Sequence, residues 1–276
     1  MNMSYKRHSV QEYCEAKFRG SKDSEWTSYK SQVASWNINP FEVQELEKAN
    51  KKDMIANASK ALISFIEALT SIDRNHYAWA IVKLYYSIFY SLRFEIMKSR
   101  HFLVRCKNVF CGELKESGTI FPLSPRKKQE KGDHQLTIAL EEQLVSEGLI
   151  IDPVLDNKID DESPYIWMLK QRERINYRIQ EFPDPECDDV LLQPSEYIHN
   201  KETTKLLKNY INKTDLSYLF DPGHCMVAVP FFRICCVLNS IDKREIGLRQ
   251  LVHIRKMAKE INLNLNELLT TLDNKK

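Results

Sequence analysis

Apolar residues recur at spacings of three and four over most of the chain, which is the period of an amphipathic helix. The first such segment begins at Pro40 and continues through Leu69. In the second, Asn75 to Arg100, apolar residues cover most of the circumference, and the polar ones align in one narrow stripe. The stripe consists of Lys83, Ser87, Ser91, Glu95 and Lys98. A helix of this kind is buried at the centre of a bundle, so we expect 75–100 to be the core helix.

Shorter helices are predicted from local start and stop signals. A helix is expected from Asp133 through Glu147, because Gly148 favours its end. Ser163 followed by Pro164 favours a helix start, so a further helix is expected over 165–180. The remaining expected helices cover 201–212, 224–240, 243–259 and 264–272. No alternating run is long enough to predict a strand, and the predicted fold class is therefore all-α.

The pattern divides the chain into three expected parts. Residues 1–44 lack sustained periodicity but contain Trp26 and Trp36, so we expect this segment to pack onto another part of the chain. Residues 45–180 are expected to form the main helical bundle, with a long insertion at 102–133 where the periodicity is lost. Residues 181–276 are expected to form a smaller C-terminal helical region.

Composition narrows the classes of function. Seven glycines in 276 residues are few, which argues against Gly-rich phosphate loops and against an all-β fold with many tight turns. Forty Lys and Arg residues stand against thirty-eight Asp and Glu residues, for a net charge of +2. The net charge therefore produces no strong electrostatic field that attracts nucleic acid or membrane, and any such affinity requires a local patch of basic residues.

The sequence predicts a cytoplasmic protein with no membrane association. The first ten residues are polar and basic with no apolar segment behind them, so no signal peptide is predicted. The longest apolar run, Cys225 to Leu238, is broken by Pro230 and Arg233. It is shorter than the roughly 20 residues that span a bilayer. An odd set of seven cysteines without a regular framework suits a reducing compartment.

Two basic segments are the candidates for binding anions. In 170–178, Arg172 and Asn176 share a helix face with apolar neighbours, and a guanidinium held there can bind a phosphate or a carboxylate. Arg174 and Arg178 form a second cationic edge. The alternative is that Arg172 pairs with an acidic group inside the bundle, such as Glu95, and only fixes packing. The second segment is a basic run formed by Arg126, Lys127, Lys128 and Lys131.

The basic run at 126–131 has no aromatic residue between its cations, so base stacking is not predicted there. It is interpreted as a surface that contacts phosphates or, alternatively, as a solvated loop. The histidines are scattered, with no HExxH motif and no pairing with cysteines at zinc spacing. We therefore predict no metal site and no cofactor.

The segment from Tyr77 to Tyr90, with its paired tyrosines and its small residue, resembles the central helix of HEPN-type helical domains, and Arg172 to Tyr177 resembles their later polar helix. The resemblance covers about 45–180. It implies a bundle of four or five helices, commonly dimeric, of a kind widespread in prokaryotic toxin–antitoxin and anti-phage defence proteins. Many such domains are metal-independent ribonucleases that use an arginine followed four to six residues later by a histidine. No arginine in this chain has a histidine at that spacing.

The leading hypothesis is therefore a non-catalytic or degenerate HEPN-like component of a prokaryotic anti-phage defence system. It would act as a homodimer or as a subunit of a larger complex, binding a partner protein and RNA or DNA. The residues predicted to bind nucleic acid are Arg126, Lys127, Lys128, Lys131, Arg172, Arg174 and Arg178. One alternative is an endoribonuclease toxin with an atypical site of Arg172, Arg174, Asn176 and Tyr177. A second alternative is a structural subunit of an ATPase or nuclease complex.

Overall fold

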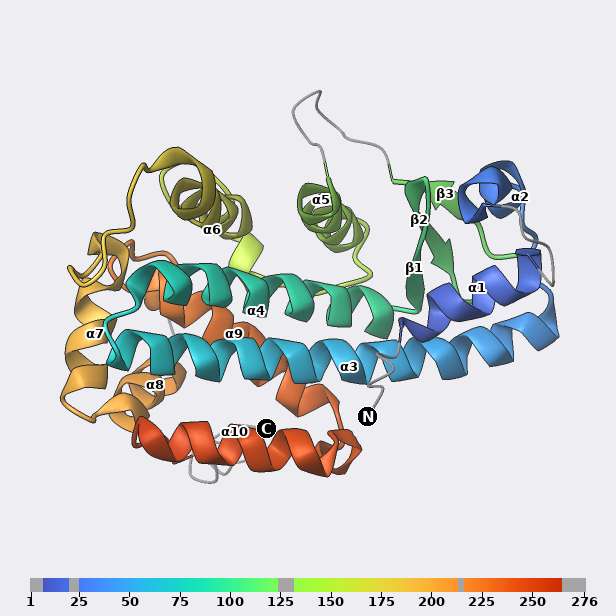
Figure 1. The fold of residues 1–276 in the computed structure, drawn as a ribbon. Helices are drawn as coiled ribbons and strands as arrows, with labels where there is room; N and C mark the ends of the chain where they lie inside the picture. The colour runs from blue at the N-terminus through green and yellow to red at the C-terminus, as the bar shows by residue number, and fades with distance from the viewer. Residues whose placement is uncertain (1–6, 20–24, 124–131, 213–215, 265–276) are drawn as a thin grey trace. The chain divides into compact units, whose positions relative to one another are not determined.

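A computed structural model describes residues 7–19, 25–123, 132–212 and 216–264, and most of them are helical (Figure 1). This confirms the predicted helical fold class. The helices are α1 (Ser9–Arg19), α2 (Lys30–Ala34), α3 (Pro40–Asp73), α4 (Tyr77–Lys98), α5 (Asp133–Ser146), α6 (Pro164–Glu173), α7 (Leu192–His199), α8 (Thr203–Asn212), α9 (Cys225–Ser240) and α10 (Leu248–Glu260). A small sheet of β1 (His101–Cys106), β2 (Asn108–Glu113) and β3 (Ile120–Pro122) accompanies them.

The long helices lie close to where the periodicity predicts them, and the differences concern shorter elements. The sheet lies where a long insertion without strands was predicted, so that prediction was wrong. Helix α7 lies between the helices expected over 165–180 and 201–212, where no helix was predicted. Helix α10 begins at Leu248, after a 3-10 turn at Lys243–Glu245, so it is shorter than expected. The helix expected over 264–272 lies, beyond Asn264, outside the described residues.

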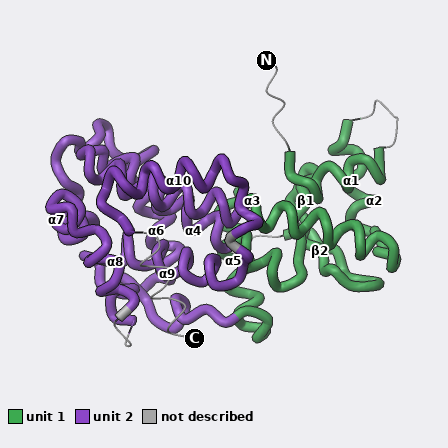
Figure 2. The backbone as a smooth tube through the Cα atoms, turned by 90° about the horizontal axis from the view of Figure 1, so that it is seen from below, with its two compact units in different colours: residues 1–56, 93–150 green, residues 57–92, 151–276 purple. Residues whose placement is uncertain are grey.

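The contacts divide the chain into two compact units (Figure 2). Unit 1 comprises residues 1–56 and 93–150, and unit 2 comprises 57–92 and 151–276. These divisions differ from the expected boundaries near residues 44 and 180. Helices α3 and α4 each contribute one part to each unit.

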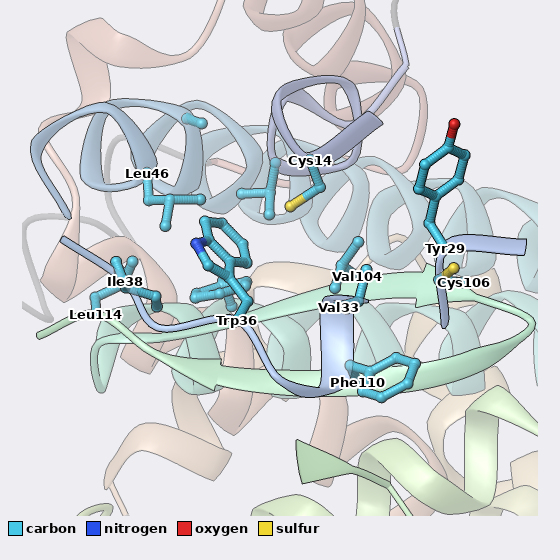
Figure 3. Packing of buried hydrophobic residues seen from close by; sticks show 13 residues of the cluster. Cys14, Tyr29, Val33, Trp36, Ile38, Leu46, Val104, Cys106, Phe110 and Leu114 are labelled. Carbon is cyan, nitrogen blue, oxygen red and sulfur yellow. The ribbon is translucent and has the colours of Figure 1, made fainter. Parts of the chain in front are cut away.

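In unit 1 the antiparallel sheet, in the order β1-β2-β3, has helices packed on both faces. Successive side chains on a strand point to opposite faces. On one face Val104 and Phe110 join Trp36 in a cluster with residues of α1, α2 and α3 (Figure 3). Phe102 belongs to the same cluster. On the other face Cys111 packs with Leu140 and neighbouring residues of α5. The N-terminal segment therefore packs onto the sheet, through the tryptophans expected to anchor it.

In unit 2 the apolar helices α4 and α9 supply much of the buried surface. Helix α9 contains Pro230 and the buried Arg233, whose side chain pairs with Asp152 at 3.2 Å. Within the described ranges, α3 has the length and composition of a membrane-crossing helix, and 67% of its most apolar 18-residue window is buried. A core helix meets the same criterion.

The start of α6 confirms the helix signal predicted at Ser163. The hydroxyl of Ser163 accepts a hydrogen bond from the backbone N–H of Ile166, and Pro164 occupies the first helical position. Replacing Ser163 with alanine leaves that N–H without its acceptor, so we expect a loss of about 1 kcal/mol in the free energy of unfolding. Urea denaturation measures this loss. Ser31→Ala, at an exposed position in α2, is the control and should change the midpoint little; an equal shift in both variants would contradict the capping role.

Candidate functional site

The candidate site in unit 2 is built at the end of α6, where the helix changes its geometry. Residues Arg174–Arg178 form a π-helical turn, and the backbone N–H of Ile179 donates to the carbonyl oxygen of Arg174 at 3.2 Å. Such turns contain more residues than an α-helical turn and occur frequently at functional sites. Arg172 lies just before this turn in the sequence. The geometry of the turn determines which of its side chains lies against Arg172, and that side chain is Tyr177.

Arg172 lies among three tyrosine rings, which we call the tyrosine cage. Its guanidinium carbon is 6.0 Å from the ring centroid of Tyr85, 5.8 Å from that of Tyr86 and 5.4 Å from that of Tyr177. One guanidinium nitrogen donates a weak hydrogen bond to the hydroxyl oxygen of Tyr86 at 3.5 Å. A cation at these distances is attracted by the negative faces of the rings. The cage therefore holds the charge of Arg172 with neutral groups.

The electrostatics of the cage distinguish Arg172 from the other arginines of this segment. In the part of the chain that the structure describes, Arg172 forms no ion pair, and its buried Nε has no hydrogen-bond partner. A buried polar group left in that state is unfavourable by about 1–3 kcal/mol. Burial raises the pKa of Tyr85, while the charge of Arg172 lowers it in part, so this phenol stays neutral at physiological pH. An anionic ligand would supply the negative counter-charge and the hydrogen-bond acceptor that Arg172 lacks among the described residues.

The other residues predicted for this site lie elsewhere. Arg174 pairs with Asp188 at 2.6 Å and donates to Gln171 at 3.0 Å. Arg178 pairs with Glu173 at 3.2 Å. The structure therefore brings Arg172 and Tyr177 together, while Arg174 and Arg178 each form an ion pair with a carboxylate. Asn176 is half-buried.

Two further expectations concern residues away from the cage. Glu95, suggested as the internal partner of Arg172, belongs to unit 1 and pairs with Lys98 at 3.3 Å. The basic run of Arg126, Lys127, Lys128 and Lys131 lies outside the described residues. The predicted anion site in the described part of unit 2 is therefore centred on Arg172.

Exposed aromatic rings in unit 2 were missed by the sequence analysis. Trp79 is 51% exposed and Phe182 49%, and their rings meet edge to face at 6.1 Å. Tyr177, on the cage, is 72% exposed. Tyr86 stacks on Tyr90 with a centroid distance of 6.0 Å. We call Trp79, Tyr86, Tyr90, Tyr177 and Phe182 the aromatic face.

A signal for this face was present in the sequence. Trp79, Tyr86 and Tyr90 are separated by seven and four residues, which places them on one side of α4. The Lys60 ammonium lies 5.4 Å from the Tyr90 ring centroid, so a second cation accompanies the aromatic face besides Arg172.

The described residues contain no group of three or more His, Cys, Asp or Glu side chains arranged to hold a metal ion. Comparison of the chain with models of protein families, with curated proteins and with solved structures gives no match.

Proposed function

We propose that the protein is a non-catalytic binding component that holds single-stranded nucleic acid on unit 2. Arg172 contacts a backbone phosphate, and the exposed rings of Trp79, Tyr177 and Phe182 stack with bases. The observation that carries the proposal is the Arg172 guanidinium, which lies among three tyrosines without an ion pair in the described part of the chain.

Exposed rings beside a cation favour a nucleic acid over a simple carboxylate ligand. Proteins that bind single strands without sequence preference combine positive charge with aromatic side chains on which bases stack. Trp79 and Tyr86 are seven residues apart on α4, or about 10 Å at 1.5 Å per residue. Stacking positions are thus distributed along the helix. With a net charge of +2 for the whole chain, affinity depends on this local surface.

The groups around Arg172 favour binding over catalysis. They are the phenol rings of three tyrosines, and burial raises the pKa of Tyr85, so that its hydroxyl stays protonated near neutral pH. General acid–base catalysis at neutral pH requires a group that titrates close to that pH. The resemblance of Tyr77–Tyr90 to HEPN-type domains supports placing this component in a prokaryotic anti-phage defence system, beside a partner protein.

The proposal is tested by fluorescence anisotropy with a labelled single-stranded RNA of twelve nucleotides and the full chain. Base–aromatic stacking contributes about 1–3 kcal/mol for each base. Since 1.4 kcal/mol is about tenfold in affinity, we expect Trp79→Ala to weaken binding by about 5- to 150-fold. Arg172→Gln should weaken it by about tenfold and reduce its dependence on salt concentration.

Two matched substitutions serve as controls. Phe41→Ala removes an aromatic side chain that is 82% exposed in unit 1, and Arg244→Gln removes an exposed arginine of unit 2. Neither belongs to the aromatic face, so both should bind as the unmodified chain does. If the unmodified chain does not bind RNA, or if the controls lose as much affinity as Trp79→Ala, the proposal is wrong. Metal-free cleavage of the RNA that disappears in Arg172→Ala and Tyr177→Phe would instead establish the endoribonuclease alternative.

A further inference from the structure

Unit 1 contains a cleft of about 680 Å³, which is separate from the tyrosine cage of unit 2. This volume lies in the range of about 300–1,000 Å³ that is common for small-molecule sites. The walls come from α1, the 3-10 turn at Trp26–Tyr29, α3, α4, the β1–β2 hairpin and the start of α5. Segments far apart in the sequence therefore meet at one concave surface.

The three carboxylates that line the cleft all have partners within unit 1. Asp53 is buried and accepts hydrogen bonds from the backbone N–H groups of Ser9 at 2.7 Å and Val10 at 3.0 Å. It thereby holds the start of α1, where the helix dipole also favours a negative charge. His8, which also lines the cleft, has its Nδ1 atom 3.8 Å from a carboxylate oxygen of Asp53.

The other two carboxylates are held by arginines. Arg7 donates two hydrogen bonds to Glu15, and this contact holds the pKa of Glu15 below its usual range. Arg105 forms an ion pair with Asp133. Because all three carboxylates are engaged, the cleft does not present an open acidic surface to a ligand.

Cations outnumber these carboxylates. The fixed cations that line the cleft are Arg7, Arg93, Arg105 and Lys107. Lys107 is exposed at the tip of the β1–β2 hairpin and forms no ion pair within the described part of the chain. Its φ of 63° lies in the left-handed region, which is unfavourable for a lysine. Strained positions of this kind cluster at ligand-binding sites.

Apolar groups lie beside the charged ones. Leu103 and Val109 contribute to the lining, as does Trp26, whose indole N–H donates to the carbonyl oxygen of Arg105 at 2.5 Å. Trp26 also stacks on Tyr29 with a centroid distance of 6.1 Å, so its ring is held in place. An inorganic anion would leave this apolar surface uncovered. The combination suits a ligand with an anionic end and a flat organic part.

We propose that the cleft of unit 1 binds a free nucleotide, with a phosphate contacting Lys107 and its base lying against the apolar wall that includes Trp26. The phosphate forms charge-assisted hydrogen bonds with the Lys107 ammonium, and the base covers apolar surface. Nucleotide binding to unit 1 is independent of RNA binding to unit 2, so failure of one leaves the other intact.

The test is isothermal titration of the full chain with ADP, with adenosine and with inorganic phosphate, in buffer that contains EDTA. ADP is expected to bind at least about tenfold more tightly than adenosine or phosphate, because it alone engages both Lys107 and the apolar wall. Lys107→Asn removes the charge but tolerates the left-handed backbone, since asparagine adopts that conformation readily. It should weaken ADP binding by about fivefold or more without lowering the midpoint of unfolding.

Two further variants make the assignment specific. Lys115→Asn removes an exposed lysine of the same unit that pairs with Glu113 outside the cleft, and it should leave ADP affinity unchanged. Arg172→Gln should likewise leave it unchanged. The proposal is overturned if the chain does not bind ADP, or if it binds ADP and adenosine with equal affinity. It is also overturned if Lys107→Asn and Lys115→Asn lose ADP affinity equally. An RNA with a 5′-phosphate that binds in a Lys107-dependent manner while ADP does not would also overturn it.

Discussion

Replacing Arg233 with methionine is expected to lower the free energy of unfolding by about 3–5 kcal/mol, because it leaves a buried carboxylate without its counter-charge. Arg233 is 1% exposed and Asp152 is 3% exposed, and their charged atoms are 3.2 Å apart. The other oxygen of Asp152 accepts from the backbone N–H of Val154 at 3.1 Å, and the hydroxyl of Tyr165 also donates to Asp152. These two hydrogen bonds hold the carboxylate in place when the arginine is removed.

A double variant separates the charge from the packing. In Arg233→Met with Asp152→Asn, the asparagine oxygen can still accept from Val154, and position 152 no longer carries a charge. We therefore expect this variant to recover most of the lost stability, measured by urea denaturation followed by circular dichroism. Arg244→Met, which breaks an exposed pair with Asp242, should leave the midpoint unchanged. A double variant no more stable than Arg233→Met alone would show that packing around Arg233, and not charge, dominates.

The helices were predictable because their signals are local. The apolar period of α4 and the start of α6 at Ser163 both lie within the segment that they define. The end of α5 before Gly148, at φ 72°, is a signal of the same kind. The sheet lacks such a signal because helices cover both of its faces, so β1 reads as an apolar run without alternation. The pairing of β1 with β2 depends on contacts between the two strands, and the spacing of apolar residues along one strand does not predict those contacts.

The candidate site was predicted in part, and the π-helical turn explains the remainder. In a continuous α-helix, Asn176 lies four residues after Arg172 and on the same face. The turn at Arg174–Arg178 closes with a hydrogen bond between residues five apart, from Ile179 to Arg174, and Tyr177, five residues after Arg172, lies over Arg172 instead. Whether a helix forms such a turn depends on packing around it. The cleft of unit 1 has no comparable signal in the sequence, because its walls come from segments more than a hundred residues apart.

Replacing Gly112 with valine is expected to lower the free energy of unfolding by about 1–3 kcal/mol through overpacking of unit 1. Gly112 pairs with Phe102 across β1 and β2, and the Phe102 ring lies over the glycine. A Cβ at position 112 would be 2.2 Å from the Phe102 Cζ atom, and Phe102 is fully buried in the cluster around Trp36. The ring therefore has little room to move away.

The same pair provides the control that identifies the cause. Phe102→Leu alone should also be destabilising, because it leaves a cavity in the core. If the clash with the ring is the cause, the smaller leucine makes room for the valine, and the double variant Gly112→Val with Phe102→Leu is less destabilised than the sum of its parts. Urea denaturation of the four proteins gives this coupling directly. Additive losses would mean that backbone conformation, and not the space taken by Phe102, requires glycine at position 112.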